Sequence, residues 1–225
     1  MPLVSTFELL VKRIAPIDNL GNLPPNIAQK LEKVARRVVQ GYFLTIANTT
    51  NTTASLRLEF IATTPNLNLD DTVVVFDIFG DNKFADLRPR PNDPKRFIFD
   101  LRIPPHDTGL VTLLPDLTNL DLIQGKRDLE IRGYVNISRV NFRGPTYDLL
   151  VTPEQRGTFL PNDINQILPD FDQIAYGIPT ANGGSFLRLE PASSLFFPVN
   201  PVNVDILDKN KELLDLMFER LDNLE

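Results

Sequence analysis

Histidine and cysteine, which supply many catalytic bases, nucleophiles and metal ligands, are nearly missing from this chain. Its 225 residues include one histidine and no cysteine. A cysteine nucleophile, a thiolate metal site and a disulfide are therefore excluded. The sequence also has neither a Walker loop nor a G-x-G-x-x-G motif, so nothing indicates nucleotide binding. We expect no organic cofactor, no required metal ion and no catalytic activity.

The one histidine, His106, follows two prolines in the segment IPPHDTG, where Asp107 could orient its ring. A Ser-His-Asp arrangement also needs a poised serine, and the sequence has no G-x-S-x-G elbow. Ser185, in GGSF, only imitates that motif. We therefore expect His106 to be a loop residue.

Asp77 is the acidic residue that most needs a structural reason, because it interrupts the apolar run TVVVFDIF at 72–79. As a general acid it would need a second carboxylate across a cleft, as in glycoside hydrolysis. Asp100, Glu130 and Glu190 lie on other predicted strands and could supply it. The favoured interpretation is structural: Asp77 faces outward beside an arginine or caps the turn after 79.

Positive charge is concentrated in the segment RPRPNDPKR, a proline-stiffened loop that contains Arg88, Arg90, Lys95 and Arg96. These cations could contact a phosphate, a carboxylate or the acidic face of a partner protein. No aromatic residue is interleaved for base stacking, and the net charge is −6, so we expect no nucleic-acid binding. The favoured interpretation is a solvated connection, with anion or partner binding as the alternative.

Short strands must position these side chains, because apolar and polar residues alternate over much of the chain. Residues 56–60 and 97–103 alternate, whereas 42–47 and 72–79 are apolar on both faces and are expected at the centre of a sheet. The polar segment NTTNTT, at 48–53, is predicted to be a hairpin loop. The fold class we predict is all-β: a single antiparallel β-sandwich, of jelly-roll or Ig-like type, with 1–225 as one domain.

One contiguous core should unite the predicted strands. Between 129 and 142 the apolar positions change from odd to even after 138, which predicts a β-bulge or a bend. The residues expected to be buried together are Leu56, Leu58, Phe60, Val74, Phe76, Ile78, Phe97, Phe99, Leu101, Leu129, Ile131 and Val135.

Two helices are predicted, a short one at about 26–38 and an amphipathic one at about 205–224. The end of the first is left open, because residues 36–39 could already belong to the next strand. In the second, heptad positions are occupied by Leu207, Asn210, Leu214, Met217 and Leu221. A polar asparagine at such a position can fix the register and strand number of a coiled coil. The helix could therefore join copies of the chain, although packing across its own sandwich is somewhat favoured because its apolar arc is wide.

The connection at 160–185 is long and irregular, which indicates either a packed excursion or a binding loop. Together with the loop at 88–96 it could hold an anionic or carbohydrate ligand, so a binding module is an alternative function. A carboxylate-based glycosidase is the other. No apolar run reaches the ~20 residues that a membrane span needs, and no signal peptide is recognised, which favours the cytoplasm.

Scarce reactive side chains and a terminal helix with an apolar arc favour a non-catalytic structural or interaction protein. We expect a β-sandwich subunit that forms homo-oligomers, with a different protein partner also possible, and no membrane insertion.

Overall fold

A computed structural model describes residues 2–14, 24–64, 68, 71–161 and 171–191. The chain divides into two compact units, 1–191 and 192–225, and the second lies outside the described residues. The predicted helix at 205–224, with Leu207, Asn210, Leu214, Met217 and Leu221, therefore lies outside them as well. Among the described residues, no helix is long and apolar enough to cross a membrane.

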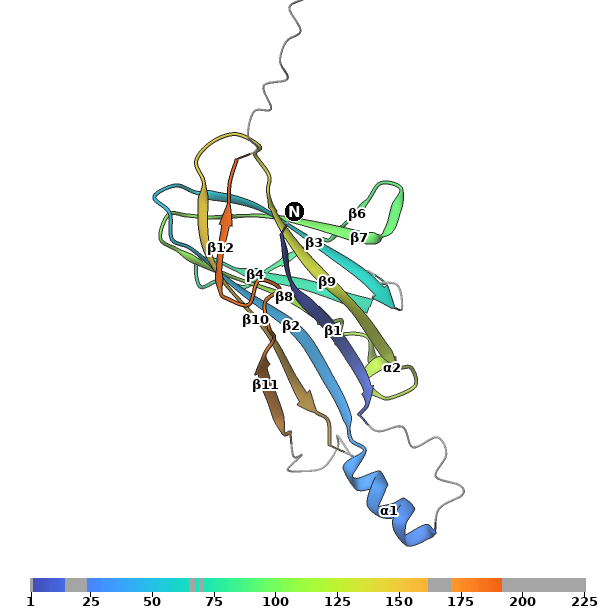
Figure 1. The fold of residues 1–225 in the computed structure, drawn as a ribbon. Helices are drawn as coiled ribbons and strands as arrows, with labels where there is room; N and C mark the ends of the chain where they lie inside the picture. The colour runs from blue at the N-terminus through green and yellow to red at the C-terminus, as the bar shows by residue number, and fades with distance from the viewer. Residues whose placement is uncertain (1, 15–23, 65–67, 69–70, 162–170, 192–225) are drawn as a thin grey trace, which may run out of the picture. The chain divides into compact units, whose positions relative to one another are not determined.

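The described unit is mostly β-strand, arranged as a curled antiparallel sheet (Figure 1). Its elements are β1 (Leu3–Arg13), α1 (Pro25–Val34), β2 (Arg37–Asn48), β3 (Ala54–Thr64), β4 (Thr72–Asp77), β5 (Lys83–Ala85), β6 (Arg88–Arg90), β7 (Asp93–Ile103), β8 (Thr108–Pro115), α2 (Leu120–Ile123), β9 (Leu129–Arg139), β10 (Tyr147–Phe159), β11 (Gln173–Gly177) and β12 (Phe186–Leu189).

Strand β2 is the point at which the sheet branches. One edge of β2 pairs with β10 over most of its length. Along its other edge, the first residues pair with β1 and the later ones, from Tyr42 to Ala47, pair with β8. Two arms start here, one running β2-β1-β9-β3-β7-β6 and the other β2-β8-β4-β5, while β11 and β12 follow the outer edge of β10.

Gly41 lies where β1 gives way to β8 along this edge of β2. A β-carbon at Gly41 would lie 2.3 Å from Cδ2 of Leu114 and 3.1 Å from the carbonyl oxygen of Leu113. A side chain here would force Leu114 to move and would crowd this backbone carbonyl, so glycine leaves room for the close approach of β8.

The two arms share one hydrophobic core. Phe7 from β1, Tyr42 from β2 and Phe60 from β3 pack ring against ring, with centroids 5.9–6.4 Å apart. The hydroxyl groups of Tyr42 and Ser5 are hydrogen bonded at 2.8 Å, and burial raises the pKa of Tyr42. The predicted core is confirmed except at Phe76, which is partly buried against the cluster, and at Ile78, which is half-buried.

Two sequence-based predictions about local structure are wrong. NTTNTT is not a hairpin loop, because β2 and β3 do not pair and the segment crosses between the arms. The buried Asn48 holds this crossing by donating to the carbonyl oxygens of Thr52, Ile103 and Pro104. Strand β4 is not central, since only β5 lies outside it. Of the two alternatives for the change of parity near 138, the structure has no bulge in β9 but a bend, because β9 ends at Arg139 and the chain bends at Val140.

The first helix is shorter than predicted. Helix α1 ends at Val34, and Arg37 already begins β2, where Val38 enters the core. The alternative in which residues 36–39 belong to the next strand is therefore the better one: the apolar spacing of Val34 and Val38 also fits a helix, but the pairing of β2 with β1 and β10 requires extended backbone.

Candidate functional site

The cationic segment at 88–96 is a β-hairpin rather than a loop. Strands β6 and β7 pair, and Pro91 and Asn92 form the turn between Arg90 and Asp93. Asn92 has a φ of 65°, which asparagine tolerates better than most residues. The hairpin forms one end of the strand order, so its side chains lie at a sheet edge.

The arginines of this hairpin are paired with carboxylates of the neighbouring strands. Arg90 and Arg96 approach the two carboxylate oxygens of Glu59, from β3, at 2.7 and 3.1 Å. The Glu59 side chain is only 2% exposed, so these two arginines neutralise a charge that would otherwise be buried alone. Lys95 is exposed and is available to solvent.

A second carboxylate, Asp100, ties the hairpin to β3. Arg57 donates two hydrogen bonds to Asp100, at 2.7 and 3.0 Å, and Arg88 adds a contact at 2.6 Å. The hydrogen bonds from Arg57, followed by those from Arg88, lower the pKa of Asp100. The four predicted contact residues are therefore brought together, but Arg88, Arg90 and Arg96 contact acids of their own chain.

Three of the four carboxylates considered for a glycosidase pair, Asp77, Asp100 and Glu130, are also engaged locally, and Glu190 is exposed. Asp77 accepts a hydrogen bond of 2.7 Å from the backbone N–H of Gly80, so it caps the turn after β4, as one of the sequence-based interpretations had it. A hydrogen bond from Lys12 lowers the pKa of Glu130. A general acid needs a raised pKa, and the shifts at Asp100 and Glu130 have the opposite direction.

His106 lies in an exposed turn with a φ of 56°. Its Nε2 is 2.6 Å from Oδ1 of Asn51, a contact that joins this turn to the crossing between β2 and β3. The interpretation as a loop histidine is confirmed. Among the residues that the structure describes, no three His, Cys, Asp or Glu side chains come together as a metal site would require.

Asp71 is a buried acid that the sequence did not single out. Arg127 donates hydrogen bonds to both of its carboxylate oxygens, and Asn68 and Asn119 add bonds of 2.9 and 3.4 Å. These contacts connect the start of β4 with the segments on either side of α2. The hydrogen bonds from Arg127 are the main cause of a lowered pKa for Asp71.

We predict that Asp71→Asn lowers the free energy of unfolding by about 1–3 kcal/mol at pH 7, because Arg127 loses a charged acceptor. A carboxyl group with a lowered folded-state pKa stabilises the protein above its ordinary pKa of 3.8 and loses that effect as the pH falls through the folded value. Urea melts at pH 7 and at about pH 3 should show the difference shrinking in acid.

Asp121→Asn is the matched control, because Asp121 and Lys126 form an ion pair whose side chains are 61% and 65% exposed. Its cost should stay within about 0.5 kcal/mol. Equal losses for the two variants at pH 7 would contradict the role assigned to Asp71.

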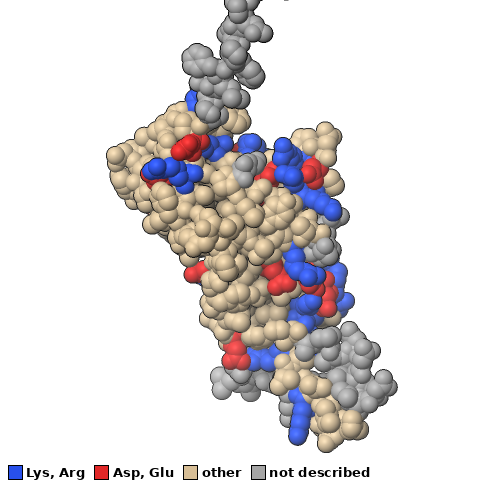
Figure 2. Space-filling view, in the orientation of Figure 1, with Lys and Arg blue, Asp and Glu red and all other residues tan. Residues whose placement is uncertain are grey.

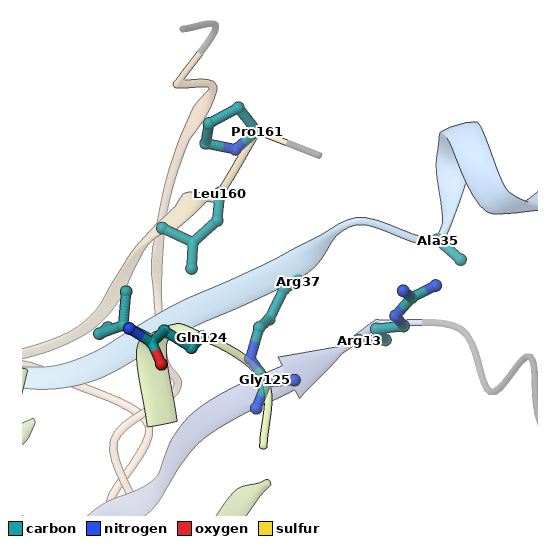
Figure 3. Close-up of a pocket in the computed structure, with 8 residues that line it drawn as sticks. Arg13, Ala35, Arg37, Gln124, Gly125, Leu160 and Pro161 are labelled. Atoms are coloured by element: carbon teal, nitrogen blue, oxygen red, sulfur yellow. The ribbon is translucent and has the colours of Figure 1, made fainter. Parts of the chain in front are cut away.

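A cavity of about 240 Å³ opens between the end of β1, the start of β2 and the turn after α2 (Figure 3). Arg13, Arg37 and Gly125 line it. The guanidinium of Arg37 donates to the carbonyl oxygens of Leu122 and Val11 at 3.1 and 3.0 Å, so it fastens α2 to β1. Arg13 is exposed at the rim, where it could attract a small anion.

A larger cavity, of about 360 Å³, lies between β1, β9 and the β10–β11 pair. Glu8, Arg132, Gln155 and Tyr176 provide its polar groups. Gln155 is 3% exposed, and its Oε1 has no hydrogen-bond partner. A small polar ligand could use these groups. Neither of these two cavities is lined by residues 88–96, one of the two segments that could have formed a shared binding site.

No family model, curated protein or solved structure matches this chain. The function therefore has to be argued from this chain's own surfaces.

Glu59, the carboxylate beneath the hairpin arginines, is not where its sequence pattern indicates. It alternates with Leu58 and Phe60, a pattern typical of a strand face exposed to water, but it is buried beneath Arg90 and Arg96. The available signal was the group of three arginines within nine residues, because an acidic protein offers many carboxylates to pair with them. The identity of those carboxylates could be known only from the strand register.

Proposed function

We propose that this chain is a non-catalytic structural or interaction protein that assembles with copies of itself. Its β-sheet, folded in the manner of a sandwich, would serve as the scaffold. The observation that carries the proposal is one side of the sheet region formed by β4, β8, β2 and β10. Strand β5 extends this region beyond β4, and β12 extends it beyond β10. We call this side the apolar sheet face.

The strand register defines this face. Residues that pair across neighbouring strands point to the same side, so Leu150 lies between Ala47 and Phe186, and Val75 lies between Thr112 and Phe84. The opposite side of the same strands faces the core. The apolar residues of the face are Phe43, Ala47, Val73, Val75, Phe84, Leu110, Leu114, Leu150 and Phe186.

The face remains accessible in the described part of the chain. Phe84 is 82% exposed, Phe186 50% and Leu150 44%. Strands that are apolar on both sides are normally covered on both sides, and an exposed apolar patch on this scale marks an interaction surface.

Four charged side chains on this face are paired within the chain, and Asp77, opposite Leu110, accepts a backbone hydrogen bond from Gly80. Asp148 pairs with Arg188 at 2.7 Å, and Arg156 with Glu154 at 2.6 Å. The surface visible in Figure 2 shows the same pattern: basic and acidic groups lie in small mixed clusters, and wide areas without charge separate them. A partner therefore need not supply charges, and a second copy offers a surface of matching apolar character.

We predict that Leu150→Glu lowers the mass of the assembly, because a carboxylate within the face would have to be buried without a partner. Multi-angle light scattering of the intact chain measures that mass. The melting temperature should change little, since Leu150 is exposed. Phe142→Glu is the matched control, as Phe142 is 75% exposed but lies outside the face. Identical masses for the two variants would remove the apolar sheet face from the interface.

The cavity beside Gln155 supports a second candidate, a binding module for a small anionic or carbohydrate ligand. Its unpartnered Oε1 and the nearby Arg132 and Tyr176 are groups that could orient such a molecule. A panel of sugars and anions that leaves the melting temperature unchanged would eliminate this candidate.

A further inference from the structure

The exposed edges of the sheet differ in how they are protected. Edge strands attract other strands unless proline, charge or shortness prevents it. Strand β6 has Pro89 between two arginines, β5 has three residues including Lys83, and β12 has four including Arg188. Strand β11, QIAYG, has no proline and no charge, and all five of its residues are exposed.

Hydrogen bonds next to β11 identify which of its backbone groups are unused. Phe159 donates to the carbonyl oxygen of Asp172 at 2.8 Å, and Ile178 donates to that of Pro153 at 3.0 Å. In an antiparallel pair the bonded positions alternate. Residues 172, 174, 176 and 178 therefore direct their backbone groups toward β10, and Gln173, Ala175 and Gly177 direct theirs away from it. Strand β10 is the one strand in the described residues that pairs with β11.

These outward groups are self-complementary. If two β11 strands run antiparallel about a two-fold axis at Ala175, then Ala175 faces its own copy and Gln173 faces Gly177 of the other chain. All of these are positions with free N–H and C=O groups, so each pair can exchange two hydrogen bonds.

Side chains fit the same register. Ile174 of one copy would lie opposite Tyr176 of the other, and these two residues are 36% and 45% exposed in the single chain. A β-branched residue facing an aromatic one is a favourable cross-strand pair. No two like charges are opposed, because the nearest charged residue, Asp172, would face Ile178.

We propose that β11 is a self-association edge, through which two copies of this chain form a continuous sheet with the order β10-β11-β11-β10. The inference rests on the proposed function, since it names one surface by which the copies join. This contact and the apolar sheet face are separate, and each is expected to contribute independently to the size of the assembly.

Ala175→Pro tests the edge directly. Proline removes the outward N–H and places its ring in the path of the second strand, but it removes no bond to β10, because position 175 points away from that strand. Ala175→Thr is the matched control, because it keeps the N–H and favours extended backbone. Sedimentation velocity of the intact chain should show the wild type and Ala175→Thr with the same mass, and Ala175→Pro with half of it.

A second variant keeps the test decisive if the proline disturbs folding. Ala175→Glu places two carboxylates opposite each other at the two-fold axis, while within its own chain residue 175 lies beside Arg156. It should keep the wild-type melting temperature and also halve the mass. If a folded Ala175→Pro or Ala175→Glu keeps the wild-type mass, the β11 edge is overturned while self-association stands. A monomeric wild type overturns both.

Discussion

Gly133→Ala is expected to lower the free energy of unfolding by about 3 kcal/mol or more, at the upper end of what overpacking costs. A β-carbon at this position of β9 would lie 2.0 Å from the carbonyl oxygen of Ile61 and 2.7 Å from the ring of Phe7. The first of these is backbone, which cannot rotate away. Strand β3 is irregular at this place, with a register shift between Ala62 and Thr64, so β1, β9 and β3 meet most closely here.

Gly177→Ala provides the matched control for this measurement. Gly177 also lies in a strand, but no atom lies within 4 Å of the position that an alanine β-carbon would occupy. Alanine there should be neutral or slightly stabilising, by about 0.5 kcal/mol, since glycine loses more backbone freedom on folding. Urea melts of the two variants give both values. A loss below about 1 kcal/mol for Gly133→Ala would mean that the three strands are not packed as described.

Phe60→Ala is expected to cost about 3–5 kcal/mol, the usual range for truncating a large buried aromatic residue. Phe60 is fully buried and lies edge-on to both Phe7 and Tyr42. Because Tyr42 belongs to the branching strand and Phe60 to the β1-β9-β3 arm, this side chain joins the two arms. The whole unit of the variant should therefore unfold in one transition, at a lower denaturant concentration than the wild type.

Phe142→Ala is the control for Phe60→Ala, since its ring is 75% exposed and should contribute less than about 0.5 kcal/mol. Circular dichroism and intrinsic tyrosine fluorescence should report the same midpoint for Phe60→Ala. Two separated transitions would contradict a single core shared by both arms.

The alternation of residue types was enough to predict the all-β class and most of the core, because a period of two directly identifies the buried side of a strand. Leu56, Leu58 and Phe60 are completely buried, and Phe97, Phe99 and Leu101 nearly so. Such predictions depend only on the residues of one strand.

Predictions about which strands pair were less successful, because pairing depends on residues far apart in the sequence. β2 and β3 are joined by the five residues 49–53 yet pair with other strands. Strand β4 is apolar on both sides without being central, and its outward residues, Val73 and Val75, lie on the apolar sheet face instead. A strand pattern cannot distinguish burial by the same chain from burial by another molecule.

For the candidate sites too, residue positions could be predicted from the sequence but contacts between distant residues could not. The positions of Arg88, Arg90 and Arg96 could be read from the sequence, but not their pairing with Glu59 and Asp100, which depends on the register of β3, β6 and β7. The free edge of β11 was equally inaccessible, because the region was predicted to be an irregular connection and its strand exists only through pairing with β10.

The central claim is that the chain associates with itself through surfaces in its β-sheet unit. Sedimentation velocity of the intact chain, from about 1 to 100 μM, tests this most directly, since specific assemblies commonly form in this range. We expect a weight-average mass of twice the 25.4 kDa monomer or more at the higher concentrations. A mass that stays at 25.4 kDa throughout would contradict the claim.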